Sequence, residues 1–134
     1  MQGLYAITPS GLEENDLLSK TEVLLKEGIK LIQYRDKFLD KKTFQEKARL
    51  LLNLTKKYGA KLLINDHIEI CLEISADGFH LGLEDYSSEG NAKLLKKNKE
   101  FITKNLICGL SCKWNKELVV NPPENEIKWT YLAV

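Results

Sequence analysis

The chain repeatedly places strong polar side chains at the end of a short apolar run. It does so in LIQYRDK (31–37), LLINDH (62–67) and ADGFHLGLED (76–85), with helix-like stretches between the runs. Such runs are typical of buried strands that carry chemistry at their carboxyl ends. Because parallel strands bring these ends to one edge of a sheet, we expect side chains from separate runs to meet there. Any fold proposed for the chain must satisfy this constraint.

Strand-like and helix-like segments alternate along the whole chain. The expected strands lie at 3–8, 31–35, 61–65, 78–81, 106–110 and 129–134. The first expected helix starts at Asn15 or Asp16 and ends before Gly28, and the second starts at Asp40 or Lys41 and ends near Gly59. A short helix is expected over 66–74, and at least one further helix over 92–104. This alternation predicts a single α/β domain over residues 1–134, with a parallel sheet that is either open and doubly wound or part of a barrel.

Bulk composition excludes several classes of protein. Twenty basic and nineteen acidic side chains leave a formal charge of +1, which gives no global preference for nucleic acid or an anionic membrane. The basic stretch KLLKKNKEFITKN favours a solvated helix over an RNA-binding surface. No membrane span or signal segment is recognisable. Three cysteines without framework spacing favour free thiols in a reducing compartment, so we expect a cytoplasmic protein.

The second expected strand presents a set of polar side chains on one face. Residues two apart share a face of a strand, so Gln33 and Arg35 point together, and Lys37 lies just beyond. A guanidinium fork beside a compact ammonium suits a phosphate or pyrophosphate. The alternative is a solvated loop of alternating charge.

The ends of the third and fourth expected strands carry oxygen ligands. Asn65 and Asp66 close one strand and Asp85 follows the next, so these side chains could hold Mg²⁺ against pyrophosphate oxygens. Asp66 could equally be the N-cap of the following helix, with Glu69 completing a capping box.

Other candidate groups have simpler interpretations. His80 shares a face with the site but is expected to be a hydrogen-bonded structural residue. Ser111, in CGLSC, could donate to a phosphate or serve as an ordinary turn serine. The histidines and cysteines lack the spacing of a structural zinc site.

These ordered motifs, from LYAIT through LIQYRDK, LLINDH, ADGFHLGLED and CGLS, resemble the thiamine-phosphate synthase family. The resemblance implies the (β/α)8 TIM-barrel fold, here an incomplete barrel of about five to six parallel strands with intervening helices. A full barrel usually needs about 200 to 250 residues, so the chain is expected to be C-terminally incomplete. Exposed sheet edges would then favour a homo-oligomer or a complementing chain.

The resemblance also implies a reaction. Enzymes of this family join hydroxymethylpyrimidine pyrophosphate to thiazole phosphate, release pyrophosphate and require Mg²⁺. It assigns catalytic roles to Arg35, Lys37 and Asn65 and the metal to Asp66 and Asp85. It places substrate contacts at Gln33, Arg35, Lys37, Asn65 and Ser111.

Two positions depart from the family pattern, because His67 and Leu83 replace a common arginine and glutamine. The family's later phosphate-binding loops have no counterpart in the chain, so the resemblance does not extend catalytic turnover to the isolated chain. A non-catalytic pyrophosphate-binding relative and a thiazole-tautomerase-like protein are the alternatives.

Overall fold

The computed structural model describes residues 3–123 and 127–134. Its six strands are all parallel and pair in the order of the sequence, β1-β2-β3-β4-β5-β6. They are β1 (Tyr5–Ile7), β2 (Leu31–Tyr34), β3 (Lys61–Asn65), β4 (Gly78–Leu81), β5 (Ile107–Ser111) and β6 (Tyr131–Ala133). The helices are α1 (Glu14–Lys26), α2 (Lys41–Lys57), α3 (Ile68–Ile74), α4 (Leu83–Tyr86), α5 (Glu89–Lys97), α6 (Lys99–Asn105) and α7 (Lys116–Val120).

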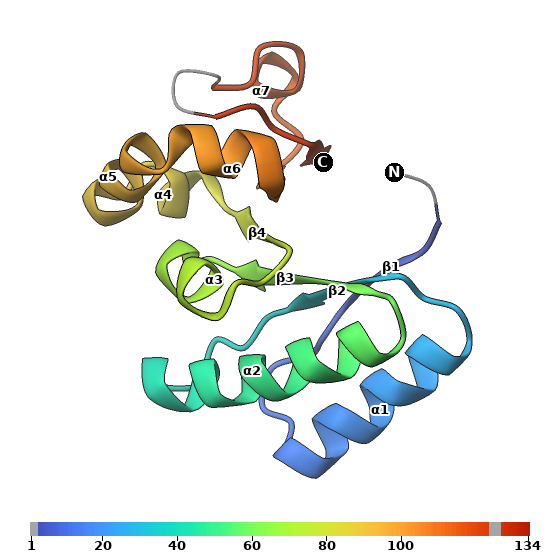
Figure 1. Ribbon diagram of the computed structural model, residues 1–134. Coiled ribbons are helices and arrows are strands. Elements are labelled where there is room, and N and C mark those ends of the chain that lie inside the picture. The colour runs from blue at the N-terminus through green and yellow to red at the C-terminus, as the bar shows by residue number, and fades with distance from the viewer. Residues whose placement is uncertain (1–2, 124–126) are drawn as a thin grey trace.

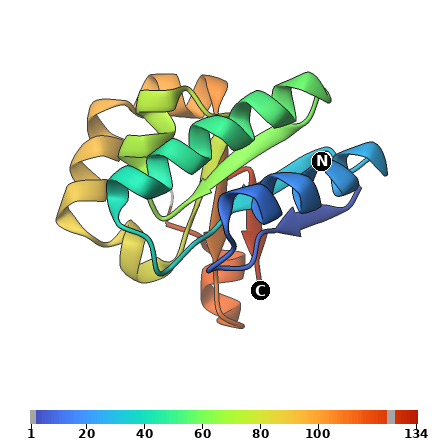
Figure 2. The same cartoon turned by 90° about the horizontal axis from the view of Figure 1, so that it is seen from below.

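The sheet is curled into half of a barrel, with the main helices on its outside (Figures 1 and 2). The edge strands β1 and β6 would lie about 24 Å apart in a flat sheet of this order. The hydroxyls of Tyr5 on β1 and Tyr131 on β6 are instead 2.9 Å apart. Of the two architectures that the strand–helix alternation left open, the barrel-type sheet is therefore the one that forms.

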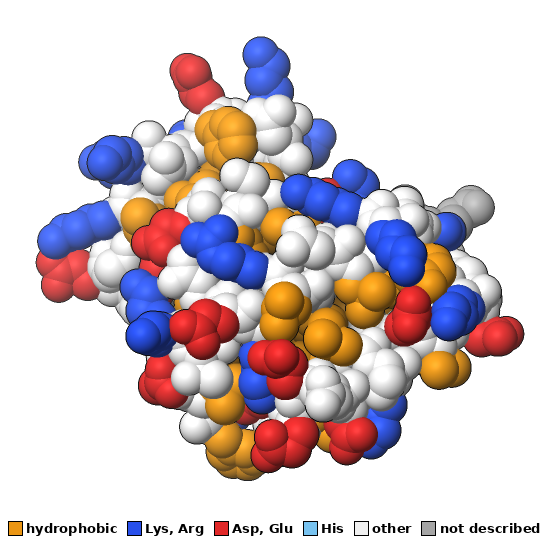
Figure 3. Space-filling view, turned by 60° about the horizontal axis from the view of Figure 1, so that its bottom comes forward, with side chains coloured by type: hydrophobic (Ala, Val, Ile, Leu, Met, Phe, Trp, Pro, Cys, Tyr) orange, Lys and Arg blue, Asp and Glu red, His pale blue; other side chains and the backbone are white. Residues whose placement is uncertain are grey.

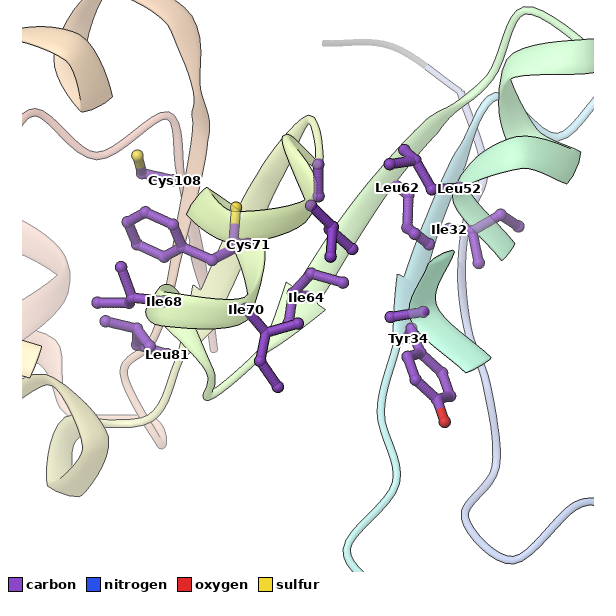
Figure 4. Close-up of a cluster of buried hydrophobic side chains, with 14 of the residues drawn as sticks. Ile32, Tyr34, Leu52, Leu62, Ile64, Ile68, Ile70, Cys71, Leu81 and Cys108 are labelled. Atoms are coloured by element: carbon purple, nitrogen blue, oxygen red, sulfur yellow. The ribbon is translucent and has the colours of Figure 1, made fainter. Parts of the chain in front are cut away.

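The hydrophobic core lies between the outer face of the sheet and the helices. Ile32 and Tyr34 of β2 point into this core, whereas Gln33 between them is buried on the inner face. The same alternation continues in β3, β4 and β5, whose outer residues Leu62, Ile64, Phe79, Leu81, Cys108 and Leu110 join the cluster. Figure 4 labels four of them, Leu62, Ile64, Leu81 and Cys108. The sequence-based assignment of faces in β2 is confirmed.

Helix α2 forms as its pattern predicts. The Asp40 carboxylate accepts a hydrogen bond from the Thr43 backbone N–H at 3.0 Å, which satisfies one of the free donors at the start of the helix. The stripe of Phe44, Ala48, Leu51, Leu52 and Thr55 is buried, as expected. Gly59 (φ 63°) follows the last turn in the left-handed conformation that glycine adopts without strain.

One expectation about the helices is wrong, and other features of the helices were not anticipated. Helix α1 begins at Glu14, and the Glu13 side chain makes no capping bond. The segment 92–104, expected to form at least one helix, forms parts of two, because Asn98 (φ −110°, ψ 15°) leaves the helical conformation and separates α5 from α6. The short helices α4 and α7 were not anticipated, since each is only one turn long and too short for a periodic pattern.

The expected helix 66–74 also begins later, at Ile68, and Asp66 is not its cap. Asp66 has φ 64° and lies outside the helix. Glu69 completes no capping box, since its carboxylate faces His67 and Lys41. A hydrogen bond with His67 and the charge of Lys41 outweigh partial burial and lower the Glu69 pKa to about 2.

The surface carries charges of both signs. On the face shown in Figure 3, basic and acidic side chains are interspersed, in keeping with the balanced composition. Within residues 3–123 and 127–134, no helix has the length and apolar character that crossing a membrane requires.

We expect Leu51→Ala to lower the free energy of unfolding by about 2–5 kcal/mol, because the side chain is fully buried and its removal leaves a cavity. The neighbouring Leu50, 37% exposed on the same helix, provides the matched control. Leu50→Ala should change stability by about 0.5 kcal/mol or less. Urea unfolding followed by circular dichroism measures both variants, and equal losses would contradict this placement of the core.

Candidate functional site

A pocket of about 350 Å³ opens at the carboxyl ends of the strands. Gln33, Arg35, Lys37, Asn65, Asp66, Asp85 and Ser111 all line it, so every site residue expected from the sequence lies in one cavity. Its remaining lining residues come from strands β1, β4 and β6, from Gly82 and the start of α4, and from the turn after β5: Tyr5, Ile7, His80, Gly82, Leu83, Glu84, Lys113 and Ala133. Separate strand ends therefore converge, as the parallel arrangement predicts.

Asp66 is the centre of a polar cluster on one wall of the pocket. The Lys37 ammonium donates to Asp66 Oδ2 at 2.6 Å, and the Asn65 side-chain amide donates to the same oxygen at 2.7 Å. The side chain of Asp66 is largely buried, whereas that of Lys37 is half exposed. The ends of β2 and β3 are thus joined through one carboxylate.

The backbone at Asp66 is strained in a way that aims its side chain. The His67 N–H donates to the Asn65 carbonyl at 2.9 Å, which makes Asp66 the central residue of a three-residue turn with φ 64°. Turns of this type with positive φ are rare. The Asp66 N–H still donates to the His80 carbonyl at 2.9 Å, so the turn remains tied to β4. Outliers of this kind cluster at functional sites.

Asp85 faces Asp66 from the other side. Burial, together with a hydrogen bond to Asp66 and its negative charge, raises the pKa of Asp85. Burial also opposes the charge of Asp66, but hydrogen bonds with Lys37 and Asp85 and the charge of Lys37 outweigh it and lower the pKa of Asp66. The two carboxylates therefore influence each other, and Asp66 keeps its negative charge more readily than Asp85.

This donor set suits a hard divalent cation. Two carboxylates converge from the end of β3 and from α4, and a cation between them would screen their repulsion. Among the described residues, no group of three or more His, Cys, Asp or Glu side chains could hold a metal ion. Asp66 and Asp85 could hold Mg²⁺ only in the way in which protein supplies one or two carboxylates, with water and phosphate oxygens completing the shell.

The loop carrying Arg35 and Lys37 is clamped by the loop after β1. The Thr8 hydroxyl accepts from the Arg35 N–H at 3.0 Å and donates to the Arg35 carbonyl at 3.2 Å. Ser10 Oγ accepts from the Lys37 N–H at 3.1 Å, and the buried Asp36 carboxylate accepts from the Gly11 N–H at 3.0 Å. These hydrogen bonds therefore fix the backbone that carries the Arg35 and Lys37 side chains.

A chain of hydrogen bonds crosses the inner face of the half-barrel. His80 Nε2 lies 2.7 Å from Ser111 Oγ, and His80 Nδ1 lies 2.8 Å from the Tyr131 hydroxyl. Tyr131 contacts the Tyr5 hydroxyl, to which the Gln33 side-chain amide donates. Burial lowers the pKa of His80, which favours the neutral imidazole. His80 is a fully partnered residue, as expected, and it also lines the pocket.

Comparisons with known proteins decide the family. The chain matches the sequence model described as thiamine monophosphate synthase over residues 4–134. It belongs to the thiamine monophosphate synthase family. The thiamine-phosphate synthase of Janthinobacterium sp. (strain Marseille) is 39% identical over 112 residues, which cover 84% of this chain and 51% of that protein. That of Nitrosospira multiformis is 47% identical over 83 residues, which cover 62% of this chain and 36% of that protein.

A solved structure supports the same fold for this family member. The thiamine phosphate pyrophosphorylase from Pyrococcus furiosus superposes with a TM-score of 0.62 at 30% identity, covering 80% of this chain and 48% of that one. The chain spans about half the length of that protein, and between about a third and a half of the curated relatives named above.

Sequence reasoning missed three kinds of residue in this thiamine monophosphate synthase family member. The clamp residues Thr8 and Ser10 were assigned only to a strand end and a turn. Tyr5 and Tyr131 were treated as strand residues, although their hydroxyls stand on the inner face. Lys113 follows Ser111 in the sequence and was overlooked, because only the curled sheet shows that it lines the pocket.

We expect Gly109→Ala to destabilise the protein by about 1–3 kcal/mol, because a methyl group there would overlap the Tyr131 ring and crowd His80. Gly90→Ala in α5 meets no atom within 4 Å and should stabilise by about 0.5 kcal/mol. Thermal unfolding of both variants measures whether the first loses stability and the second gains it. A neutral Gly109→Ala would contradict the packing of the inner face.

Proposed function

We propose that this family member binds hydroxymethylpyrimidine pyrophosphate together with Mg²⁺ and couples it to thiazole phosphate, releasing pyrophosphate. The observation that carries the proposal is the convergence of Arg35, Lys37, Asn65 and the Asp66–Asp85 pair in one pocket. The names of the relatives support the reaction class. The pocket's charges support the diphosphate substrate.

The proposed chemistry needs little proton transfer. The bond between the pyrimidine methylene carbon and the pyrophosphate oxygen breaks, and its electron pair leaves with pyrophosphate. The thiazole nitrogen supplies the pair for the new carbon–nitrogen bond. Negative charge grows on the departing oxygens, so the donors of Arg35, Lys37 and Asn65 stabilise the transition state more than the ground state.

The other lining residues have supporting roles in this proposal. Asp66 and Asp85 would hold Mg²⁺, which when bound neutralises charge on the pyrophosphate. Lys37 would then exchange its contact with Asp66 for a phosphate oxygen. Gln33 and Ser111 stand deeper on the inner face and would contact the pyrimidine, while His80 and Tyr131 fix the Ser111 and Tyr5 hydroxyls.

We expect Asp66→Asn to reduce formation of thiamine phosphate by about 100-fold or more, since the neutral amide cannot serve as the ionised metal ligand. Asparagine also tolerates the positive φ at this position, so the turn should persist. Chromatographic detection of product, with both substrates and Mg²⁺, measures the rate.

Asp16→Asn, on the exposed surface of α1, is the matched control and should leave the rate unchanged. Full activity in Asp66→Asn would overturn the metal assignment. Calorimetry with Mg²⁺ and pyrophosphate separates the alternative function, because binding without turnover would identify a non-catalytic pyrophosphate-binding relative. Absence of both binding and turnover would overturn the proposal itself.

We also propose that a second copy of this chain, or a complementing chain, covers the edges of the sheet. Strands β1 and β6 have no outer partner among the described strands, and Leu4, Ile7 and Val134 beside them are 78%, 53% and 63% exposed. Unpaired apolar edges favour association. The cytoplasmic location expected from the sequence stays a prediction.

We expect light scattering on the purified chain at micromolar concentration to give a mass above 15.3 kDa that falls on dilution. A mass that remains at 15.3 kDa at all concentrations would contradict self-association and leave the complementing chain as the occupant.

A further inference from the structure

The turn between β5 and α7 has an unusual backbone. The Asn115 N–H donates to the Cys112 carbonyl at 2.9 Å, which closes a four-residue turn around Lys113 and Trp114. Both central residues have positive φ, 47° and 59°. Turns with two positive φ values strongly prefer asparagine and glycine, and neither lysine nor tryptophan relieves the strain.

The surrounding structure holds this turn in place from both sides. The Cys112 N–H donates to the Ala133 carbonyl of β6 at 2.7 Å, and Cys112 is fully buried. At the other end, Asn115 Oδ1 accepts from the N–H groups of Glu117 and Leu118 at 3.0 and 3.3 Å and caps α7. The left-handed conformation is therefore imposed on Lys113, and it sets the direction of the side chain.

Lys113 lines the pocket and forms a weak ion pair there. Its ammonium lies 3.7 Å from the Glu84 carboxylate, and the two side chains are 64% and 90% exposed. Ion pairs this exposed contribute little to stability. The ammonium can therefore leave Glu84 for a more strongly charged group at small cost.

The position of Lys113 complements the other cations. Arg35 and Lys37 reach the pocket from the end of β2, whereas Lys113 reaches it from the end of β5. A diphosphate carries charged oxygens on two phosphorus atoms, and an ammonium on a flexible stem suits one of them. Cations on two walls can contact both ends of such a group.

We infer that Lys113 is a further substrate-binding residue, which exchanges Glu84 for an oxygen of the diphosphate when the pocket fills. The inference rests on the proposed function and adds a residue that the sequence motifs did not include. It also assigns Glu84 the role of a competing carboxylate that holds the ammonium when the diphosphate is absent.

The test is calorimetric titration of the full chain with inorganic pyrophosphate and Mg²⁺ at low ionic strength. We expect Lys113→Asn to weaken binding about tenfold, the effect of losing one charge-assisted hydrogen bond at a partly exposed site. Asparagine is favoured at positive φ, so the turn should be kept or improved, and thermal unfolding checks this. Lys113→Arg should retain most of the affinity.

Lys116→Asn is the matched control, because it removes the same charge at a position three residues further along that does not line the pocket. It should change affinity less than twofold. Glu84→Gln should tighten binding about twofold in the native background and by less in Lys113→Asn. An equal gain in both backgrounds would contradict the exchange.

The outcomes separate this inference from the proposed function. If the unaltered chain binds pyrophosphate and Lys113→Asn binds equally well, the role of Lys113 is wrong and the proposed function stands. If the unaltered chain does not bind pyrophosphate, the proposed function fails and the inference falls with it. A loss in Lys116→Asn as large as in Lys113→Asn would show only a general charge effect and would overturn the specific contact.

Discussion

The structure depends on the different coverage of the two faces of its parallel sheet. Parallel sheets are normally buried on both sides, and here helices cover only the outer one. The inner face is closed by curvature, which brings Tyr5 and Tyr131 on the two edge strands into hydrogen-bonding contact. Buried polar groups need partners, and the chain from Gln33 through the tyrosines to His80 and Ser111 supplies them. The same curvature gathers the strand ends into a pocket.

The pocket is also where local preferences are violated. Asp66 occupies a rare turn conformation, and Lys113 and Trp114 follow one another at positive φ. Local rules agree with the fold at the Asp40 cap and at Gly28 and Gly59, which follow helices with positive φ. Ser75, at the end of α3 and outside the pocket lining, is a further non-glycine residue with positive φ (57°). Conflict between local preference and overall fold is expected at functional sites. At Asp66 and Lys113 an unfavourable backbone conformation fixes the orientation of a side chain that lines the pocket.

Several features could be read from the sequence because they depend on short-range periodicity. The six strands, the buried stripe of α2 and the two faces of β2 follow from alternation and helical spacing, and all were predicted. The site residues at the strand ends followed from the same reasoning together with the family resemblance. The break at Asn98 and the late start of α3 were missed, since both depend on how neighbouring elements pack.

Asp66 shows most clearly the difference between what the sequence predicts and what the tertiary structure decides. From the sequence it was equally a metal ligand or a helix cap, because the residues after it allow a capping box. The tertiary structure rejects the cap, since pairing of β3 with β4 holds its backbone N–H and Lys37 and Asn65 take its carboxylate.

The sequence by itself determined the parallel α/β fold, the family and the residues at the strand ends, because these depend on local order along the chain. Only the tertiary structure decided that Tyr5 meets Tyr131, that Asp66 faces Asp85 and that Lys113 enters the pocket. Those contacts join residues distant in the chain, and the contact between Tyr5 and Tyr131 exists because the sheet curls and brings its two edges together.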